Sequence, residues 1–418
     1  MKETSATYKW QIYLAIAGLL FLSATCFVLQ LAQQHFIFPD SNTYVTAAQK
    51  WYGSFSADET RPLLISMIEG FPLLFGFSVR AIFIWSVFVN AFCWILTMIM
   101  LFEILKTFLL PKHAFLFALA FMFCMGSTII VFHLLAETVF TFFLFLVVFL
   151  TGKYIRSQQF WYLALALSML VLSVLVKPAS TILLVVYFLY FSWVLFKNRK
   201  KKSMLLVYAS LFFLLLQMGL MYKQYGNFTV SYIDSFTYYN YLGTRADGLK
   251  SRAEFKQLDN ERATYLNSLS LPEQKHEAAK DFINQFSHNT LNLVKAYGIN
   301  VWHNSVKGST SISECKNYNH TPYFETFRLL FKVLAKIQVL FFSICGTLLA
   351  LYYLVKSYRK DIFFTFVSVV ILYIVGISGI SSEQGDRFHI VVYSFIIILL
   401  AKFLSEKTKT FRPDASIH

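Results

Sequence analysis

Residues 160–196, FWYLALALSMLVLSVLVKPASTILLVVYFLYFSWVLF, decide the fold. Lys177 is the one charged residue in these 37 positions. As a single helix the stretch would be about 55 Å long at 1.5 Å per residue, far longer than the hydrocarbon layer of a bilayer. Pro178 would also disrupt the interior of such a helix. We therefore predict two membrane-spanning helices, 160–176 and 179–196, that meet at Lys177-Pro178.

The composition extends this pattern to the whole chain. Hydrophobic residues make up 57% of the 418 positions and charged residues 14%, against about 45–50% and about 25% in soluble domains. We predict an all-α polytopic membrane protein with about ten transmembrane helices, because uncharged stretches of spanning length recur along the chain. The helices are expected at 10–32, 80–105, 114–132, 136–152, 160–176, 179–196, 203–222, 327–355, 361–380 and 388–404.

The chain has a net charge of +15, and its basic residues are placed like the anchors that flank membrane-spanning helices. Basic residues collect in short clusters between apolar stretches, above all at 197–202, whereas the short turns on the other side hold only Lys177 and Arg387. Such a bias places the clusters in the cytoplasm. We therefore predict cytoplasmic termini, an uncleaved first span and no nucleic-acid partner.

Residues 62–79, PLLISMIEGFPLLFGFSV, are long enough to span but are interrupted by Glu69, Gly70 and Pro72. If they crossed the membrane, the basic cluster at 197–202 would face outward, against the charge bias. We therefore predict interfacial helices here.

The predicted spans divide the chain into three regions. An N-terminal transmembrane module, 1–222, contains a catalytic first outer loop at 33–79. A mainly helical extracytoplasmic loop, 223–325, forms a cap on the bundle. Within this cap, Ser270-Leu-Pro-Glu273 is a capping box that predicts a helix to about residue 286. The C-terminal region, 326–418, supplies the remaining transmembrane helices and a cytoplasmic tail.

Ionisable residues at the outer ends of spans are candidates for function, because charge near the hydrocarbon layer is costly. The set comprises Asp40, Glu69, Glu137, Lys177, Glu383, Asp386, Arg387 and His389. They are far apart in the chain but are expected on one face of the membrane, which predicts a single outward-facing site.

Two of these carboxylates have alternative interpretations. Asp40 follows the first span and could act as a general base, or it could cap a helix over 41–50. Glu137 opens a span, where the helix dipole alone favours an acid.

Lys177, Arg387 and His389 are cations that could bind a phosphate group. Aromatic residues of the outer loops, Tyr238 and Tyr241 among them, could stack on sugar rings or form an interfacial belt.

Several standard chemistries are missing from the sequence. The five cysteines form no CxxC pair, and there is no Walker A loop, G-x-G-x-x-G, H-E-x-x-H or G-x-S-x-G motif.

A series of short motifs resembles the GT-C superfamily of integral membrane glycosyltransferases, near the protein O-mannosyltransferase and lipid A aminoarabinose transferase group. The motifs are Asp40-Ser-Asn-Thr-Tyr44 with Ala47, Arg61-Pro-Leu-Leu64, Ala136-Glu137-Thr138, Lys177-Pro178 and Gly385-Asp386-Arg387-Phe388. They follow the family order over most of residues 10–404, while the cap matches nothing in it.

The resemblance implies a sugar donor carried on a polyprenyl phosphate and a glycan, lipid or protein acceptor. Inverting transfer would occur on the extracytoplasmic face of a membrane, with the bacterial inner membrane and periplasm expected. Asp40 and Glu137 would be catalytic, and Lys177, Arg387 and His389 would bind the donor phosphate. Tyr44, Arg61, Glu69 and Asp386 would bind substrate.

The resemblance implies no certain cofactor, and it is compatible with a bound divalent metal ion as well as with none. The family often has two acidic residues in its first-loop motif, whereas Ser41 and Asn42 follow Asp40 here.

Two other functions remain as alternatives. An O-antigen polymerase or ligase would also have many spans and a large outer loop, and would use arginines of that loop such as Arg245. A flippase or transporter of lipid-linked sugars would instead place polar residues near the membrane midplane.

Overall fold

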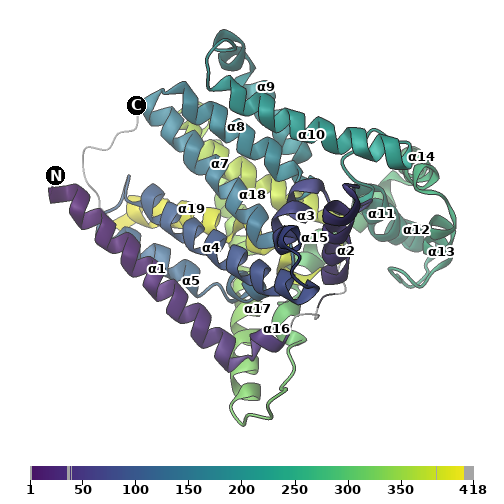
Figure 1. Ribbon diagram of the computed structural model, residues 1–418, viewed down its shortest axis with the longest axis horizontal. Helices are drawn as coiled ribbons and strands as arrows, with labels where there is room; N and C mark the ends of the chain where they lie inside the picture. Colours follow the sequence, from purple (N-terminus) through teal and green to yellow (C-terminus); the bar gives the residue numbers. More distant parts are fainter. Residues whose placement is uncertain (1, 35–37, 39, 383, 409–418) are drawn as a thin grey trace.

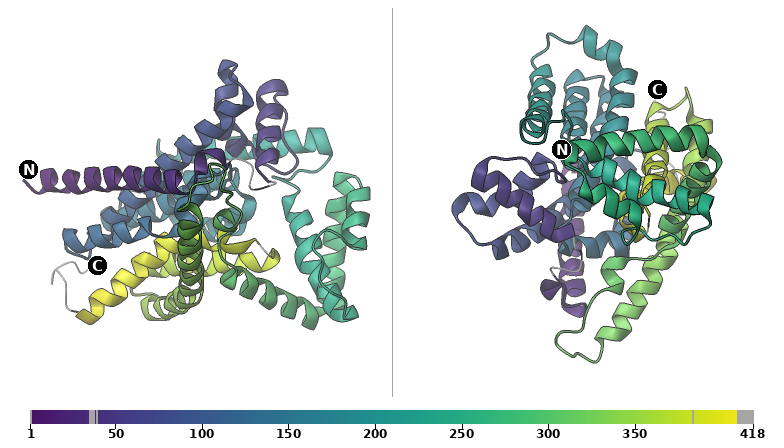
Figure 2. Two further views of the ribbon diagram at one scale, coloured as in Figure 1. Left: turned by 90° about the horizontal axis from the view of Figure 1, so that it is seen from below. Right: turned by 90° about the vertical axis from the view of Figure 1, so that its right-hand side faces the viewer.

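The structure is a computed structural model that describes residues 2–34, 38, 40–382 and 384–408. Every regular element in this part of the chain is a helix, which confirms the predicted all-α class. Long apolar helices run side by side, and α1 begins and α19 ends at the same end of the bundle (Figures 1 and 2). Helices α2, α3 and α11–α15 gather at the opposite end, which we call the outer end.

Eight described helices are long and apolar enough to span a membrane, and a bent pair of helices is a ninth candidate, whereas α8 is apolar but shorter. The protein is therefore an integral multi-pass membrane protein. In chain order the helices are α1 (Lys2–Val28), α4 (Val79–Leu105), α5 (Pro111–Met122) with α6 (Met125–Ile129), α7 (Glu137–Ser157), α8 (Phe160–Val174), α9 (Thr181–Lys197), α10 (Met204–Tyr225), α17 (Phe324–Ser357), α18 (Ile362–Ile377) and α19 (Tyr393–Thr408).

The predicted break within 160–196 is confirmed, and α9 is a candidate span, whereas α8 is an apolar helix shorter than the candidate spans. Helix α8 ends at Val174, Lys177 has an extended backbone, and a 3₁₀ turn (Pro178–Ser180) leads into α9. The Ser173 hydroxyl donates a hydrogen bond to that of Ser180 at 2.9 Å across the break. This break holds Lys177 at the outer end of both helices.

The prediction of one continuous span over 114–132 is wrong. Helices α5 and α6, the latter continued by a 3₁₀ turn (Ile130–Phe132), are bent by 68° at residues 123–124. A polar side chain of α17 stabilises the break, because the amide of Gln338 donates to the Phe123 carbonyl at 2.6 Å and accepts from the Met125 N–H at 2.9 Å. Broken helices persist in membranes where such partners replace the lost backbone bonds.

Residues 62–79 form two short elements, α3 (Leu63–Glu69) and a 3₁₀ helix, η2 (Phe71–Phe75). Neither is among the candidate spans. Phe71, Leu74 and Phe75 are exposed, as expected for a segment at the membrane interface.

The cap is helical between residues 233 and 313. Its elements are α11 (Ile233–Thr237), a π-helix η5 (Tyr238–Gly243), α12 (Thr244–Ser251), α13 (Glu261–Ser268), α14 (Leu271–His288), α15 (Thr290–Val306) and α16 (Thr310–Ser313). The predicted capping box is present at Ser270 and Glu273. Helix α15 is fixed to the bundle by Asn300, whose amide donates to the Gly379 carbonyl at 3.0 Å, and by Asn304, whose amide donates to the Ser378 carbonyl at 2.9 Å.

Replacing Gln338 with leucine should destabilise the protein. The substitution leaves a backbone carbonyl and a backbone N–H without a partner at the α5–α6 break, at a cost of about 1–3 kcal/mol for each buried group. The melting temperature of the detergent-purified protein should fall clearly for Gln338→Leu and little for Lys332→Leu at an exposed position of the same helix. Equal melting temperatures would show that Gln338 does not hold the break.

Candidate functional site

A cavity of about 830 Å³ lies between the outer end of the bundle and the cap. Its walls come from α9, α10 and α18 on one side and from α11, η5 and α14 on the other. Six residues that the sequence singled out line it, namely Asp40, Tyr44, Arg61, Glu137, Lys177 and Arg387. The structure therefore brings together segments separated by up to 347 positions in the chain.

Arg387 is at the centre of the charged end of this cavity. Its Nη2 donates to Asp40 Oδ2 at 3.0 Å and to Glu137 Oε1 at 2.9 Å. Its Nε also donates to Glu137 Oε1 at 3.1 Å, and Lys177 Nζ lies 3.3 Å from the same oxygen. The Glu137 side chain is only 2% exposed, whereas that of Asp40 is 39% exposed. Glu137 is thus the buried anchor for two cations, and Asp40 is the carboxylate that faces the cavity.

Asp40 is the first residue of α2 (Asp40–Ser54). Its second oxygen, Oδ1, lies 3.3 Å from Arg61 Nη2, so both carboxylate oxygens contact an arginine. Within the described residues, no backbone N–H of the first turn of α2 donates a hydrogen bond to this carboxylate. The capping alternative therefore does not account for its orientation.

Arg61 is held by its neighbours on α2. Its Nε donates to Thr43 Oγ1 at 2.8 Å and its Nη1 to the Tyr44 hydroxyl at 3.3 Å, and its guanidinium lies 4.2 Å from the centre of the Tyr44 ring. Tyr44 is itself fixed, because its hydroxyl accepts from the Ala136 N–H at 3.3 Å. Burial raises the pKa of Tyr44 to about 12, so this hydroxyl stays protonated at neutral pH.

A turn before Arg61 fixes the direction in which its side chain leaves the backbone. Asp58 Oδ1 accepts from the backbone N–H groups of Thr60 at 2.9 Å and Arg61 at 3.0 Å, and Lys50 Nζ lies 2.9 Å from Oδ2. Burial would raise the pKa of Asp58, but the hydrogen bonds from Lys50 and from the backbone outweigh it and hold that pKa below its usual range. Asp58 therefore acts as an ionised clamp on this turn.

The charges of the site do not cancel. Arg61, Lys177 and Arg387 face the carboxylates of Asp40 and Glu137, which leaves one positive charge in excess. We call these five residues the charge cluster. Burial lowers the pKa of Lys177, and the Glu137 carboxylate beside it opposes that shift. An excess cation with partly buried neighbours is suited to binding an anion such as phosphate.

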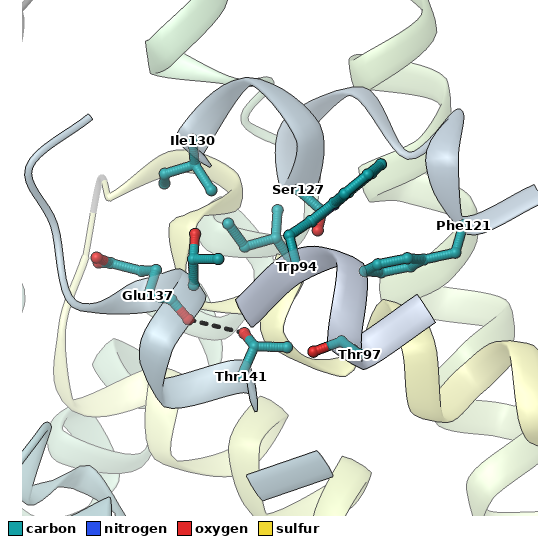
Figure 3. A pocket seen from close by; sticks show the side chains of 9 residues that line it. Trp94, Thr97, Phe121, Ser127, Ile130, Glu137 and Thr141 are labelled. Atoms are coloured by element: carbon teal, nitrogen blue, oxygen red, sulfur yellow. Dashed lines mark hydrogen bonds between the residues drawn. The ribbon is translucent and has the colours of Figure 1, made fainter. Parts of the chain in front are cut away.

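A second, much smaller cavity of about 10 Å³ lies behind the first turn of α7 (Figure 3). Trp94, Phe121 and Ile130 line it, together with Thr141, whose hydroxyl donates to the Glu137 carbonyl at 2.8 Å. Such a volume holds one water molecule at most. The carboxylate of Glu137 points away from these residues, toward the charge cluster.

Three predicted site residues do not reach the large cavity. His389 is fully buried, and its ring nitrogens hydrogen-bond with Ser343 Oγ at 2.5 Å and Ser378 Oγ at 3.0 Å. Asp386 is buried against Gly126, and Glu69, the last residue of α3, is also buried. A phosphate in the cavity would not contact His389, and a substrate there would not contact Asp386 or Glu69. Glu383 lies outside the described residues.

Four contributing residues were not predicted to take part in the charge cluster. Asp58 has the sequence signal of a turn, an aspartate two residues before a threonine and ahead of Arg61-Pro62. Thr43 and Gln384, which accepts from Arg387 Nη1 at 3.2 Å, carry no signal that separates them from other polar loop residues. Tyr241, predicted either to stack on sugar rings or to belong to an interfacial belt, lines the cavity, and its hydroxyl accepts from Gln384 Nε2 at 3.4 Å.

Neither the loop arginines nor a metal cluster contributes to the large cavity. Arg245, Arg262 and Arg328 are not among the residues that line it. Arg262 instead pairs with Asp281 at 2.9 Å. Among the described residues, no group of three His, Cys, Asp or Glu side chains could hold a metal ion.

Comparisons with known proteins add one structural similarity. No family model matches the chain, and no curated protein matches it by sequence. The chain is similar to the crystal structure of ArnT from Cupriavidus metallidurans bound to undecaprenyl phosphate, with a TM-score of 0.38 and 12% identity over 95% of this chain and 79% of that chain. A similarity of this size says nothing about activity, so the function proposed below rests on the geometry of the site.

Glu69 should make stability depend on pH. Burial raises the pKa of Glu69 from 4.5 to about 8, against the opposing effect of the Ser86 hydroxyl. The folded protein thus holds a proton that the unfolded chain releases above about pH 4.5, so rising pH should cost about 1.4 kcal/mol per unit up to about pH 8. Glu69→Gln should remove this slope in melting temperature, whereas Glu254→Gln at an exposed position should retain it. A slope unchanged in Glu69→Gln would contradict the assignment.

Proposed function

We propose that this protein is a membrane glycosyltransferase of GT-C type, which moves a sugar from a polyprenyl phosphate to an acceptor hydroxyl. The observation that supports it best is the large cavity itself. One end is a cluster of five charged residues with one positive charge in excess, and the rest is lined by apolar and polar residues of the cap and, on the membrane side, by apolar residues such as Ile182, Met218 and Ile377. The motif resemblance of the sequence supports the same class.

The charge cluster suits the phosphate of such a donor. Arg387 and Arg61 offer forked donors, and Lys177 offers a point charge at the junction of α8 and α9. Phosphate oxygens would bind these cations in place of part of their contacts with Asp40. The excess positive charge would then stabilise the polyprenyl phosphate as it leaves.

The apolar part of the cavity suits the isoprenoid chain. Ile182 of α9, Met218 of α10 and Ile377 of α18 line it on the side of the membrane helices. A donor whose chain stays in the bilayer needs no nucleotide pocket, in keeping with the absence of nucleotide-binding motifs from the sequence.

In the proposed inverting displacement, the acceptor hydroxyl oxygen attacks the anomeric carbon of the sugar and the bond to the phosphate oxygen breaks. Asp40 takes the hydroxyl proton, and the bonding electrons leave with the polyprenyl phosphate. Asp40 suits this role because it is the exposed carboxylate of the charge cluster.

Glu137 takes a positioning role in this scheme. It is buried and contacts Arg387 and Lys177 directly, so it sets the spacing of the two cations without reaching the acceptor. This differs from the catalytic role that the motif resemblance implies for it.

The site would face the side of the membrane opposite the basic clusters, because the charge cluster lies at the outer end of the bundle. With the positive-inside bias of the sequence, this supports an extracytoplasmic site, in the periplasm if the chain is a bacterial inner-membrane protein.

Asp40→Asn should abolish transfer, with a loss of about 10²-fold or more from removal of the general base. Mass spectrometry of glycolipids, glycans and glycoproteins from cells with and without the gene identifies the modified product, and the same measurement then compares variants. Thr46→Ala, at an exposed position of α2, is the matched control and should retain full product. Wild-type product levels with Asp40→Asn would overturn the role of Asp40, and no difference on deleting the gene would overturn the transferase itself.

A further inference from the structure

Helix α14 of the cap has an exposed apolar face. Phe282, Ile283 and Phe286 are 44%, 65% and 60% exposed, and their spacing places them on one side of the helix. The opposite side carries polar residues such as Lys280, whose side chain is 71% exposed. The helix lies crosswise to the long apolar helices (Figure 2). An amphipathic helix in this orientation is typical of a membrane surface.

The exposed face continues onto α15. Leu291, Val294 and Trp302 are exposed on one side of that helix. The other side is docked on the bundle, where the Tyr297 hydroxyl donates to the Gly376 carbonyl of α18 at 2.6 Å. Because Gly376 is near the outer end of a membrane helix, this contact places α15 at the level of the membrane surface.

The apolar face of α14 is also continuous with the large cavity. Ala278, Ala279 and Phe282 line that cavity from the cap side. Across from them, Ile182 of α9 lines the cavity and is 57% exposed, although it belongs to a candidate span. Val185 and Leu189, which are exposed but do not line the cavity, lie on the same side of α9 as Ile182, so the cavity reaches the lipid-facing surface between α9 and α14.

Charges beside the apolar face favour a lipid partner. Lys275 lines the cavity at the start of the face, and Lys295 is exposed beside Val294 on α15. The acidic Asp281 is turned inward to Arg262. Basic residues flanking an apolar stripe attract the anionic head groups of a bilayer.

We propose that the apolar face of α14 and the start of α15 rest on the membrane leaflet at the outer end, and that the large cavity opens to that leaflet beneath α14. The partner is the lipid bilayer itself. Lipids reach the cavity sideways between α9 and α14. The proposal stands on exposure and geometry, and it holds whether or not the protein transfers a sugar.

Fluorescence quenching tests the contact with lipid. The full chain carries either Ile283→Cys or Lys280→Cys, in a background in which Cys26 and Cys345 are replaced by alanine. Each variant is labelled with a small fluorophore at the new cysteine. The labelled proteins are then reconstituted into vesicles of zwitterionic and anionic phospholipid. Lipids with a spin label near the head group should quench the fluorophore at position 283 about twofold or more strongly than the fluorophore at position 280. Aqueous iodide should instead quench the fluorophore at position 280 more strongly than the one at position 283. Stronger iodide quenching at 283 than at 280 would overturn the proposal.

A photo-reactive benzoylphenylalanine in place of Phe282 or Phe286 provides a second test that keeps an aromatic side chain at each position. Illumination of the reconstituted protein should give adducts with the mass of a phospholipid at both positions, and at 282 these report the opening of the cavity. Adducts with a second copy of the chain or with another protein, or the absence of any phospholipid adduct at both positions, would overturn the proposal. Neither test measures sugar transfer, so its failure is distinguishable from failure of the proposed function.

Discussion

The ion pair between Glu137 and Arg387 is the interaction on which the site depends. A buried carboxylate costs several kcal/mol in a membrane protein unless it is paired and hydrogen-bonded. Glu137 meets this requirement through two donors of Arg387 and one of Lys177. The pairing fixes the start of α7, the break between α8 and α9, and the turn before α19 relative to one another. Asp40 and Arg61 then extend the same network from the first outer loop.

The arrangement separates two tasks between two carboxylates. Glu137 is buried and holds the two cations through Oε1, while Asp40 shares its arginines with the open cavity. A phosphate entering the cavity would compete with Asp40 more readily than with Glu137, because the contacts of Glu137 are buried. In the proposed scheme, the apolar part of the cavity wall and the exposed face of α14 would provide a path for a lipid-borne substrate to the charge cluster.

The sequence predicted the elements whose signal is strong and local. Lys177-Pro178 marked the break between two spans, and Ser270 with Glu273 marked the start of α14. It also indicated the convergence of Asp40, Glu137, Lys177 and Arg387, because each is an ionisable residue at the outer end of a span. The bend at 123–124 was not predictable, since it depends on Gln338 more than 200 positions away. Asp386 and His389 were misplaced because they lie in two successive 3₁₀ turns (Gly385–Arg387 and His389–Val392), which direct neighbouring side chains to different sides of the chain, and sequence order does not show which.

Lipid binding by the purified protein tests the central claim that the cavity binds a lipid phosphate at its cationic end and the lipid chain at its apolar part. Native mass spectrometry of the protein in nanodiscs compares a polyprenyl monophosphate with the neutral polyprenol of the same chain length. The phosphate-bearing lipid should bind about tenfold or more tightly, which corresponds to about 1.4 kcal/mol from the excess positive charge. Equal affinities for the two lipids would contradict the account, because the charge cluster would then make no contact with the headgroup.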